Sequence, residues 1–378
     1  MDSGALWKLK RELIRVFRQV EGPLKSRYFR YRYDLITSKE VRSTEGEAQI
    51  TDEVALYLIY PDAGVLPSHL NMLDEIINAG ITPIVVSNLP LTRDGKKKIL
   101  NRCSVLIERP NVGYDFGGYR DGILSLSKGI SRWKRLWLFN DSTWYIPQKT
   151  SWFDAVRQRS EDFIGASSTS TRGGVESFRD VHSYWPYSID SNLFHYGSFA
   201  LSIGPRILSD PAFLRFWRKL NITDDKKQTV VRGELGLTQW VKRHRYSHCA
   251  TTNLDELDVI VSQMALPELR SLAETVLLLD NAKVESLRKS VCQVGSDGKF
   301  DRPALEAFIL FATARFGFAY AMADFIIGHR QFHFLKKSPV WLNSTSARTI
   351  EEIAERIPGF IGESIRNEVR GLRGRSES

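Results

Sequence analysis

The sequence predicts an α/β fold in which a mostly parallel sheet carries helices on both faces, followed by a helical region at the C-terminal end. Two observations lead to this prediction. Between residues 54 and 140, apolar runs of strand length alternate with helical patterns, which is typical of a parallel sheet buried on both faces. From about residue 255 onward the patterns are helical. A chain of 378 residues is long enough for one large domain and a smaller one.

Four apolar strands open the predicted sheet, with helices between them. These elements are the strands Val54–Tyr60, Ile81–Ser87, Ser104–Glu108 and Arg135–Asn140 and the helices Ser68–Ala79, Lys96–Arg102 and Tyr119–Lys128. Residues 150–250 then mix strands and helices. Ligands of such sheets bind beyond the carboxyl ends of the strands, so the polar residues there are candidate site residues. They are Tyr60, Ser87, Asn88, the segment Asn111–Asp115 and the segment Asn140–Ser142.

Composition divides the chain into three predicted parts: a basic amphipathic segment over 1–50, the α/β domain over 51–254 and the helical region over 255–378. Within residues 5–33, apolar side chains recur at helical spacing among many lysines and arginines. This helix either packs on the main domain or lies on an anionic membrane surface. The polar residues 38–52 are interpreted as a linker.

Charge, cysteine content and hydropathy limit the class of protein. The net charge of +9 favours an anionic partner, but no nucleic-acid-binding module is recognisable, so no nucleic acid is expected. Cys103, Cys249 and Cys292 are far apart, which suits a reducing compartment without disulfides. No secretory signal is visible, and charges interrupt the best apolar run at 304–328. A cytoplasmic location is therefore expected.

The first candidate motif is Asn111-Val-Gly-Tyr-Asp-Phe-Gly-Gly-Tyr-Arg120, between a predicted strand and a predicted helix. Glycines such as Gly113 allow a tight turn or a close approach of the backbone to a ligand. The start of the helix can bind a diphosphate through its amides. Asp115 suits a ribose hydroxyl and Arg120 suits a phosphate. A tight turn capped by Asp115 is the alternative interpretation.

The second candidate is Asn140-Asp141-Ser142, directly after an apolar strand. A carboxylate beside small oxygen-bearing side chains suits Mg²⁺ or Mn²⁺, which binds one or two protein carboxylates together with substrate phosphates. An aspartate that only forms a turn is the alternative.

The third candidate is Glu234-Leu-Gly-Leu-Thr238, at the start of a predicted helix. A glutamate that faces the same cleft can remove a proton from a sugar hydroxyl, which is the general-base step of a direct displacement. An acid favoured only by the helix dipole is the alternative.

Taken in order, these motifs resemble the rhamnan synthesis F family. The order is the Asn-and-Gly motif, the strand ending in Asn140-Asp141-Ser142, then Asp162-Phe-Ile-Gly165, His195-Tyr-Gly-Ser-Phe199 and Glu234-Leu-Gly-Leu-Thr238. The likeness runs from about Val54 to Tyr246. More distantly, the layout is similar to inverting GT-A glycosyltransferases, in which a strand carries an Asp-x-Asp metal motif and a later acid acts as base.

The resemblance implies a GT-A-like glycosyltransferase, inverting and assisted by Mn²⁺ or Mg²⁺. The sugar would be a deoxyhexose such as rhamnose, carried by a nucleoside diphosphate, and the acceptor a cell-surface polysaccharide or a lipid-linked glycan. Asp141 would hold the metal and Glu234 would be the base. The implied nucleotide-sugar-binding residues are Tyr60, Ser87, Asn88, Asn111, Gly113, Tyr114, Asp115, Arg120, Asn140 and His195. A lipid-linked acceptor implies peripheral attachment at the inner face of the cell membrane.

Four features leave alternatives open. Asn140-Asp141-Ser142 has one carboxylate where the distant pattern has two, so a metal-independent reaction is possible. His195 contacts phosphate, completes a metal shell or is structural. His329 and His333 are four residues apart in an apparently helical stretch, but no acidic partner is spaced for a zinc site. The cluster Arg243, His244, Arg245 and His248 is a solvated helix end or attracts a pyrophosphate-bearing acceptor.

Three rival functions remain at this level. A non-catalytic scaffold or sugar-binding component of a polysaccharide assembly complex would keep the fold without needing a cation or a base. A nucleic-acid-binding protein would explain the net charge. A nucleotide-dependent enzyme of another class, such as a sugar-phosphate transferase, would not require this order of motifs.

Overall fold

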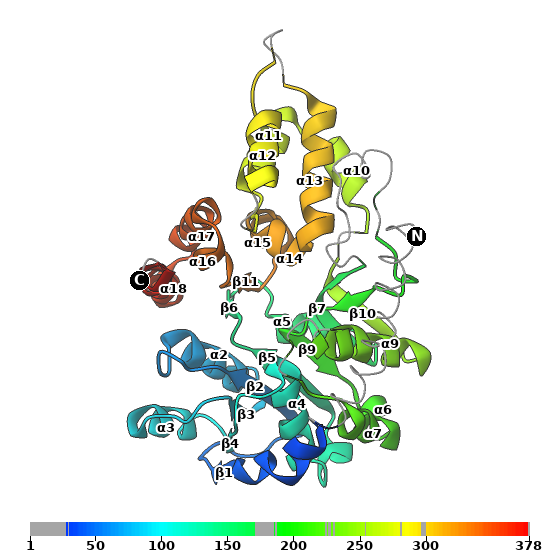
Figure 1. The fold of residues 1–378 in the computed structure, drawn as a ribbon, viewed down its shortest axis with the longest axis vertical. Coiled ribbons are helices and arrows are strands. Elements are labelled where there is room, and N and C mark those ends of the chain that lie inside the picture. Colours follow the sequence, from blue (N-terminus) through cyan, green and yellow to red (C-terminus); the bar gives the residue numbers. More distant parts are fainter. Residues whose placement is uncertain are drawn as a thin grey trace, which may run out of the picture.

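The computed structural model describes residues 28–376 except 29, 171–184, 186, 224, 226, 227, 230, 254, 280, 281 and 296–299. The strands of the main sheet are β1 Arg42–Glu45, β2 Glu53–Ile59, β3 Thr82–Ser87, β4 Val105–Glu108, β5 Arg135–Asn140, β7 Phe163–Thr169, β8 His195–Tyr196, β9 Ala200–Ile203 and β10 His248–Thr252. Their order is β1–β4–β3–β2–β5–β9–β7–β10, with β8 paired to β7 (Figure 1).

Most of these strands run in one direction. β4, β3, β2 and β5 pair in parallel. β9 is antiparallel to both β5 and β7, so β7 and its parallel neighbour β10 run the same way as β5. β1, β8 and β9 run in the opposite direction. The predicted mostly parallel sheet is confirmed, and the carboxyl ends of its main strands meet at one edge.

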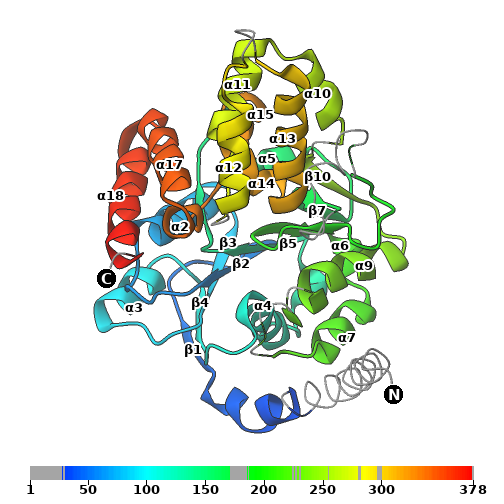
Figure 2. The same ribbon diagram turned by 45° about the horizontal axis from the view of Figure 1, so that its top comes forward.

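Helices cover both faces of the sheet. They are α2 Pro67–Asn78, α3 Arg93–Leu100, α4 Tyr114–Ser125, α5 Trp152–Arg157, α6 Pro205–Leu208, α7 Pro211–Lys219 and α9 Gly236–Arg243, with a π-helical turn, η4, at Val231–Leu235. Because side chains alternate along a strand, the odd-numbered residues of β2 join a core with α2 and α5, while its even-numbered residues join a core with α4, α7 and α9. Figure 2 shows α2 and α4 on opposite sides of the sheet.

Helix α4 begins at Tyr114, five residues before the predicted start, and two of the motif's glycines lie inside it. A Cβ on Gly117 would stand 2.1 Å from the carbonyl oxygen of Val112. A Cβ on Gly118 would stand 2.4 Å from the Leu58 side chain of β2. These two glycines therefore let the helix pack closely on the sheet. Gly113 is different: its φ of 79° places it in the left-handed region at the N-cap.

The C-terminal region is mainly helical. Its helices are α10 Leu257–Gln263, α11 Leu266–Thr275, α12 Ala282–Val291, α13 Arg302–Phe316, α14 Phe318–Ala321, α15 Ala323–Arg330, α16 Pro339–Leu342, α17 Ser344–Arg356 and α18 Gly359–Ser376. The expectation of a wholly helical region is wrong at one place, because β11, Phe334–Lys336, pairs with β6, Thr143–Tyr145. The apolar run at 304–328 is divided among α13, α14 and α15. None of the helices in the described ranges combines the length and the apolarity that a membrane crossing requires.

Helix α18 is fixed to the α/β domain through a buried carboxylate. Glu368 accepts hydrogen bonds from the backbone N–H of Ser68 at 2.7 Å and from Trp144 Nε1 at 2.8 Å. Lys337 Nζ lies 3.5 Å from the same carboxylate, and both charged side chains are buried. The start of α2, β6 and the C-terminal region therefore meet at Glu368.

The N-terminal predictions are only partly covered by the described residues. The basic amphipathic helix expected at 5–33 lies outside them as far as residue 27, while residues 30–35 are helical. The linker interpretation of 38–52 is wrong for Arg42–Glu45, which forms β1 and pairs antiparallel with β4. The three-part division of the chain stays a prediction.

Candidate active site

Asp141 lies at the carboxyl end of β5, where two other parts of the fold reach its carboxylate. The backbone N–H of Tyr60, just after β2, donates to Asp141 Oδ2 at 2.7 Å. His69 Nε2, on α2, lies 3.2 Å from the same oxygen. The Asp141 side chain is 19% exposed, whereas that of His69 is 1% exposed. Asp141 is thus held by these two contacts and remains partly exposed to solvent.

The hydrogen bonds of His69 define which ring nitrogen carries the proton. The backbone N–H of Leu66 donates to His69 Nδ1 at 3.1 Å, so Nδ1 is an acceptor. Nε2 then carries the hydrogen that faces Asp141. This arrangement orients the carboxylate.

The environment of Asp141 keeps its carboxylate ionised. Burial acts to raise the pKa of Asp141, but the interaction with His69, the positive charge of Lys337 and the N–H of Tyr60 outweigh it. The pKa therefore lies below its ordinary value. An ionised carboxylate at the end of a central strand suits a role as a ligand to a cation.

Asn140 joins the end of β5 to the start of α4. Its Nδ2 donates to Asp115 Oδ2 at 2.9 Å, and its Oδ1 accepts from the hydroxyl of Ser142 at 2.6 Å. Asp115 lies in the first turn of α4, where a carboxylate is favoured by the helix dipole. The first two sequence motifs therefore meet directly, through side chains, at the sheet edge.

Glu234 reaches the same edge from η4. Glu234 Oε1 accepts the backbone N–H of Ser198 at 2.8 Å, and the carbonyl oxygen of Ser198 accepts the hydroxyl of the buried Tyr119 at 2.8 Å. Burial raises the pKa of Tyr119, and the negative charges of Asp115, Glu234 and Asp141 add to that shift. The three carboxylates thus surround one phenol, so the structure brings the three motifs together.

A cavity of about 540 Å³ lies beyond β3 and β4, where Asn88 and Asn111 form part of its wall. This volume is in the range of small-molecule sites. Arg109, buried in the same wall, donates to Asn88 Oδ1 at 2.6 Å and to the carbonyl oxygen of Val112 at 2.7 Å. Ser87 donates its hydroxyl to the carbonyl oxygen of Leu89 at 2.6 Å. The cavity has room for part of a nucleotide, next to the loop that leads into α4.

Other predicted residues occupy different surroundings. Tyr60 and Tyr114 are exposed at 45% and 40%. Arg120 is buried, and its guanidinium donates to the carbonyl oxygen of Trp217 at 3.1 Å and to Asp34 at 2.7 Å. Those contacts tie α4 to α7, and they occupy two nitrogens of the group that the sequence suggested for a phosphate. His195 is buried in β8, with its Nδ1 2.7 Å from the carbonyl oxygen of Leu193.

The C-terminal region adds two lysines to the turn around Asp141. β11 pairs with β6, so Lys336 Nζ lies 3.3 Å from Ser142 Oγ and 4.1 Å from the centre of the Phe199 ring. The backbone N–H of Lys337 donates to the carbonyl oxygen of Ser142 at 3.0 Å. Sequence reasoning missed His69 and both lysines, because no motif connects them with Asp141 and only the fold brings them there.

The expectation that His329 and His333 share one helical stretch is wrong. α15 ends at Arg330, so the two histidines do not share a helix. Burial lowers the pKa of His333 to about 4, although its hydrogen bond with Thr150 acts in the opposite direction. His333 is a neutral structural side chain.

One protein family matches the sequence that forms this site. The model of rhamnan synthesis protein F matches residues 83–285, which is more than half of the chain. This chain belongs to the rhamnan synthesis protein F family. The range shared with the family contains Asp115, Asn140, Asp141 and Glu234, while His69 and Lys336 lie outside it.

Two individual proteins extend the comparison. An uncharacterized protein of Sinorhizobium fredii, y4gN, is 31% identical over 237 residues, which are 61% of this chain. The chain spans 57% of that relative's length. A mannosyltransferase from Pyrobaculum calidifontis, solved with GDP-mannose and Mn²⁺, aligns over 96% of this chain and 93% of its own at 10% identity. Its TM-score of 0.29 is too low to support an argument.

The possible metal ligands around Asp141 limit the kind of metal site that this chain can form. In the described part of the chain, no three His, Cys, Asp or Glu side chains are grouped so that they could hold a metal ion. Both described contacts of the Asp141 carboxylate fall on Oδ2, and none of the described hydrogen bonds involves Oδ1. One carboxylate oxygen suits Mg²⁺ or Mn²⁺ only when phosphates and water complete the shell.

Proposed function

We propose that this chain is a glycosyltransferase that moves a sugar from a nucleoside diphosphate sugar to a glycan acceptor. One observation carries the proposal: side-chain and backbone hydrogen bonds connect Asp115 with Asn140 and Tyr119 with Glu234 beside Asp141, at the carboxyl edge of a parallel sheet. Membership of the rhamnan synthesis protein F family supports a glycosyltransferase as the class of activity. It also motivates a deoxyhexose such as rhamnose as the sugar.

The donor would lie across the ends of β2 to β5. The cavity beside Asn88 and Asn111 has room for the nucleoside. The diphosphate would then reach the start of α4 near Gly113, where helix amides favour an anion, and Lys336 beside Ser142 would face its negative charge. Asp141 would hold Mn²⁺ or Mg²⁺, which would supply positive charge to stabilise the leaving diphosphate.

Glu234 is the proposed general base. Its Oε1 is held by the N–H of Ser198, which orients the carboxylate while Oε2 stays available for a proton. The acceptor oxygen forms a bond to the anomeric carbon and its proton passes to Glu234. The bond from that carbon to the diphosphate breaks, and the nucleoside diphosphate leaves with the electron pair. This single displacement inverts the configuration at the anomeric carbon.

The proposed acceptor is a cell-surface polysaccharide or a lipid-linked glycan. A lipid-linked acceptor would place the protein at the inner face of the cell membrane, where the basic residues of 1–33 meet anionic lipids. Co-sedimentation with anionic vesicles tests this part, and equal recovery with neutral vesicles argues against it.

The test is a transfer assay with labelled donor sugars and membranes that carry the acceptor. Glu234→Gln should reduce the rate of transfer by roughly 10²- to 10⁴-fold, because a general base contributes about that much, and Asp141→Ala should reduce it strongly as well. Glu268→Gln is the matched control, since Glu268 is an exposed acid in the first turn of another helix. Full transfer by both site variants would leave a non-catalytic scaffold or a sugar-binding component as the function.

A further inference from the structure

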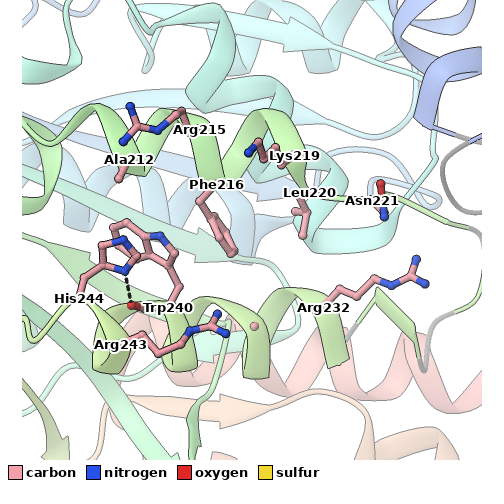
Figure 3. A pocket seen from close by; sticks show the side chains of 11 residues that line it. Ala212, Arg215, Phe216, Lys219, Leu220, Asn221, Arg232, Trp240, Arg243 and His244 are labelled. Carbon is pink, nitrogen blue, oxygen red and sulfur yellow. Dashed lines mark hydrogen bonds between the residues drawn. The ribbon is translucent and has the colours of Figure 1, made fainter. Parts of the chain in front are cut away.

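A second cavity, of about 520 Å³, opens between α7 and α9 (Figure 3). Arg215 and Lys219 of α7, Arg243 at the end of α9 and Arg232 of η4 line it, and Figure 3 shows Arg215 and Arg232 toward opposite ends of the view. Trp240 forms an aromatic wall, against which the ring of His244 lies with centroids 4.4 Å apart. Four cations therefore line one cavity that is large enough for a phosphorylated group.

Carboxylates in the described part of the chain balance the positive charge of this cavity only in part. Within the described ranges, no ion pair reaches Arg215, Lys219, Arg232 or Arg243. Asp225 acts on Arg232 only by its more distant charge. Asp210, the N-cap of α7, acts on Arg215 and His244 by its charge. Four cations around one cavity nevertheless favour an anion with several oxygens, and arginine matches phosphate because its planar donors can bind two oxygens at once.

The interior wall of the cavity also contains polar atoms without partners. Arg232 Nη1 and Asn221 Oδ1 are both buried, and neither has a hydrogen-bond partner among the described residues. A buried donor or acceptor left unpaired costs about 1–3 kcal/mol. After a side-chain shift that uncovers these atoms, a ligand phosphate would satisfy the Arg232 donor and a ligand hydroxyl would satisfy the Asn221 acceptor. The unpaired atoms therefore distinguish this cavity from a solvated end of a helix.

The cavity is connected to Glu234 through one turn of backbone. Arg232 and Glu234 both belong to η4; Arg232 faces the cavity, while Glu234 faces Ser198. A ligand anchored by its phosphate at Arg232 would be held by a residue two positions along the same turn from the proposed base. We infer that this cavity binds the phosphate or diphosphate group of the acceptor, apart from the donor site. The identification of the ligand as the acceptor rests on the proposed function, whereas the binding of an anion does not.

The basic cluster noted at residues 243–248 is divided by the structure. Arg243 and His244 line the cavity. His248 lies in β10 instead, with its Nδ1 2.7 Å from the Tyr196 hydroxyl. The pyrophosphate interpretation of the cluster is therefore carried by its first two residues together with α7 and η4.

The test is calorimetric titration of the full chain with inorganic pyrophosphate. The variant Arg215→Ala/Arg243→Ala removes two exposed cations of the cavity, so its fold should be kept. Its dissociation constant should rise at least about tenfold, because two charge-assisted contacts are lost. The control Lys128→Ala/Arg132→Ala removes the same charge from exposed residues outside the cavity and should bind as the unaltered chain does. Equal affinities in the two variants, or no binding by the unaltered chain, would overturn the inference.

Two further titrations separate the sources of the phosphate and the two proposals. Vesicles of phosphatidylcholine containing a prenyl diphosphate represent a lipid-linked acceptor, and a soluble sugar diphosphate represents a free one. Binding of either that the cavity variant loses supports the inference, and binding of neither contradicts it. A nucleoside diphosphate sugar should bind both variants equally. If it binds no form of the protein while the pyrophosphate result holds, the anion site stands and the proposed function fails.

Discussion

Asp141 is subject to opposing influences that decide its charge. Burial favours the protonated acid, while His69, Lys337 and the N–H of Tyr60 favour the carboxylate and prevail. The sequence predicted the position of Asp141 at a strand end, because an apolar run followed by Asn-Asp-Ser is visible in the chain. It did not predict His69, since a histidine inside a helix pattern carries no sign of its partner.

A pH dependence follows from the lowered pKa of Asp141. A carboxylate whose pKa is lower in the folded chain stabilises the fold above the ordinary pKa and loses that effect as pH falls through the folded value. The free energy of unfolding should therefore differ most between the unaltered chain and Asp141→Asn near neutral pH. The difference should shrink below about pH 4.

Denaturant titrations at a series of pH values measure this difference. Asp258→Asn, at an exposed position on α10, serves as the control and should follow the unaltered chain throughout. A difference for Asp141→Asn that stays constant, or grows in acid, would show that the surroundings of Asp141 do not favour its ionised form.

The sequence predicted that a helix follows β4, but it did not predict the role of two glycines in helix α4. The glycine motif correctly indicated a turn between β4 and a helix, with Gly113 in a left-handed conformation. Gly117 and Gly118 were interpreted in the same way, but they lie inside the helix at its contacts with Val112 and Leu58. A glycine in the sequence shows only that a side chain is absent. The structure is needed to show which neighbouring atoms lie where that side chain would be.

Gly117→Ala should destabilise the protein although alanine is the better helix former. The added Cβ would stand 2.1 Å from the carbonyl oxygen of Val112, and overpacking of this kind costs about 1–3 kcal/mol. Gly371→Ala, in α18, meets nothing within 4 Å and should raise stability by about 0.5–1 kcal/mol. Thermal unfolding of the two variants compares them, and a stabilised Gly117→Ala would contradict the close packing of α4.

The contact of α18 with the α/β domain gives a second prediction for an element. Glu368→Ala removes the acceptor of two hydrogen bonds and leaves the buried Lys337 without its carboxylate, although Ser68 Oγ still accepts from Nζ at 2.8 Å. Breaking a buried pair in this way costs about 3–5 kcal/mol, so the melting temperature should fall by many degrees. Glu363→Ala changes an exposed residue of the same helix and should have little effect. Similar melting temperatures would mean that α18 is not anchored at Glu368.

At the scale of the whole molecule, the order of the elements was largely predictable. The pairing of the C-terminal region with the α/β domain through β11 was not. Strict alternation of apolar strands and helices determines a parallel sheet, and β2 to β5 appear where the sequence places them. The return of the chain at β11 was not predicted, because a strand of three residues has too few positions to show a period. Yet β11 brings Lys336 to Ser142 and completes the surroundings of Asp141.

The same reasoning applies to the candidate site. Asp115, Asn140, Asp141 and Glu234 could be predicted as candidates because each follows or opens a recognisable element, and all four act on the pKa of Tyr119. Arg120 could not be assigned from its motif, because the direction of its side chain depends on α7 and Asp34. Residues contributed by distant segments are visible only after folding.

The most direct test of the central claim is thermal unfolding with a panel of nucleoside diphosphate sugars, each with and without Mn²⁺. A ligand that binds only the folded chain stabilises it by RT ln(1 + [L]/Kd). At least one donor should therefore raise the melting temperature in a concentration-dependent way, and Asp141→Ala should weaken that response. An unchanged melting temperature across the whole panel, with and without the cation, would contradict a donor site at this edge of the sheet.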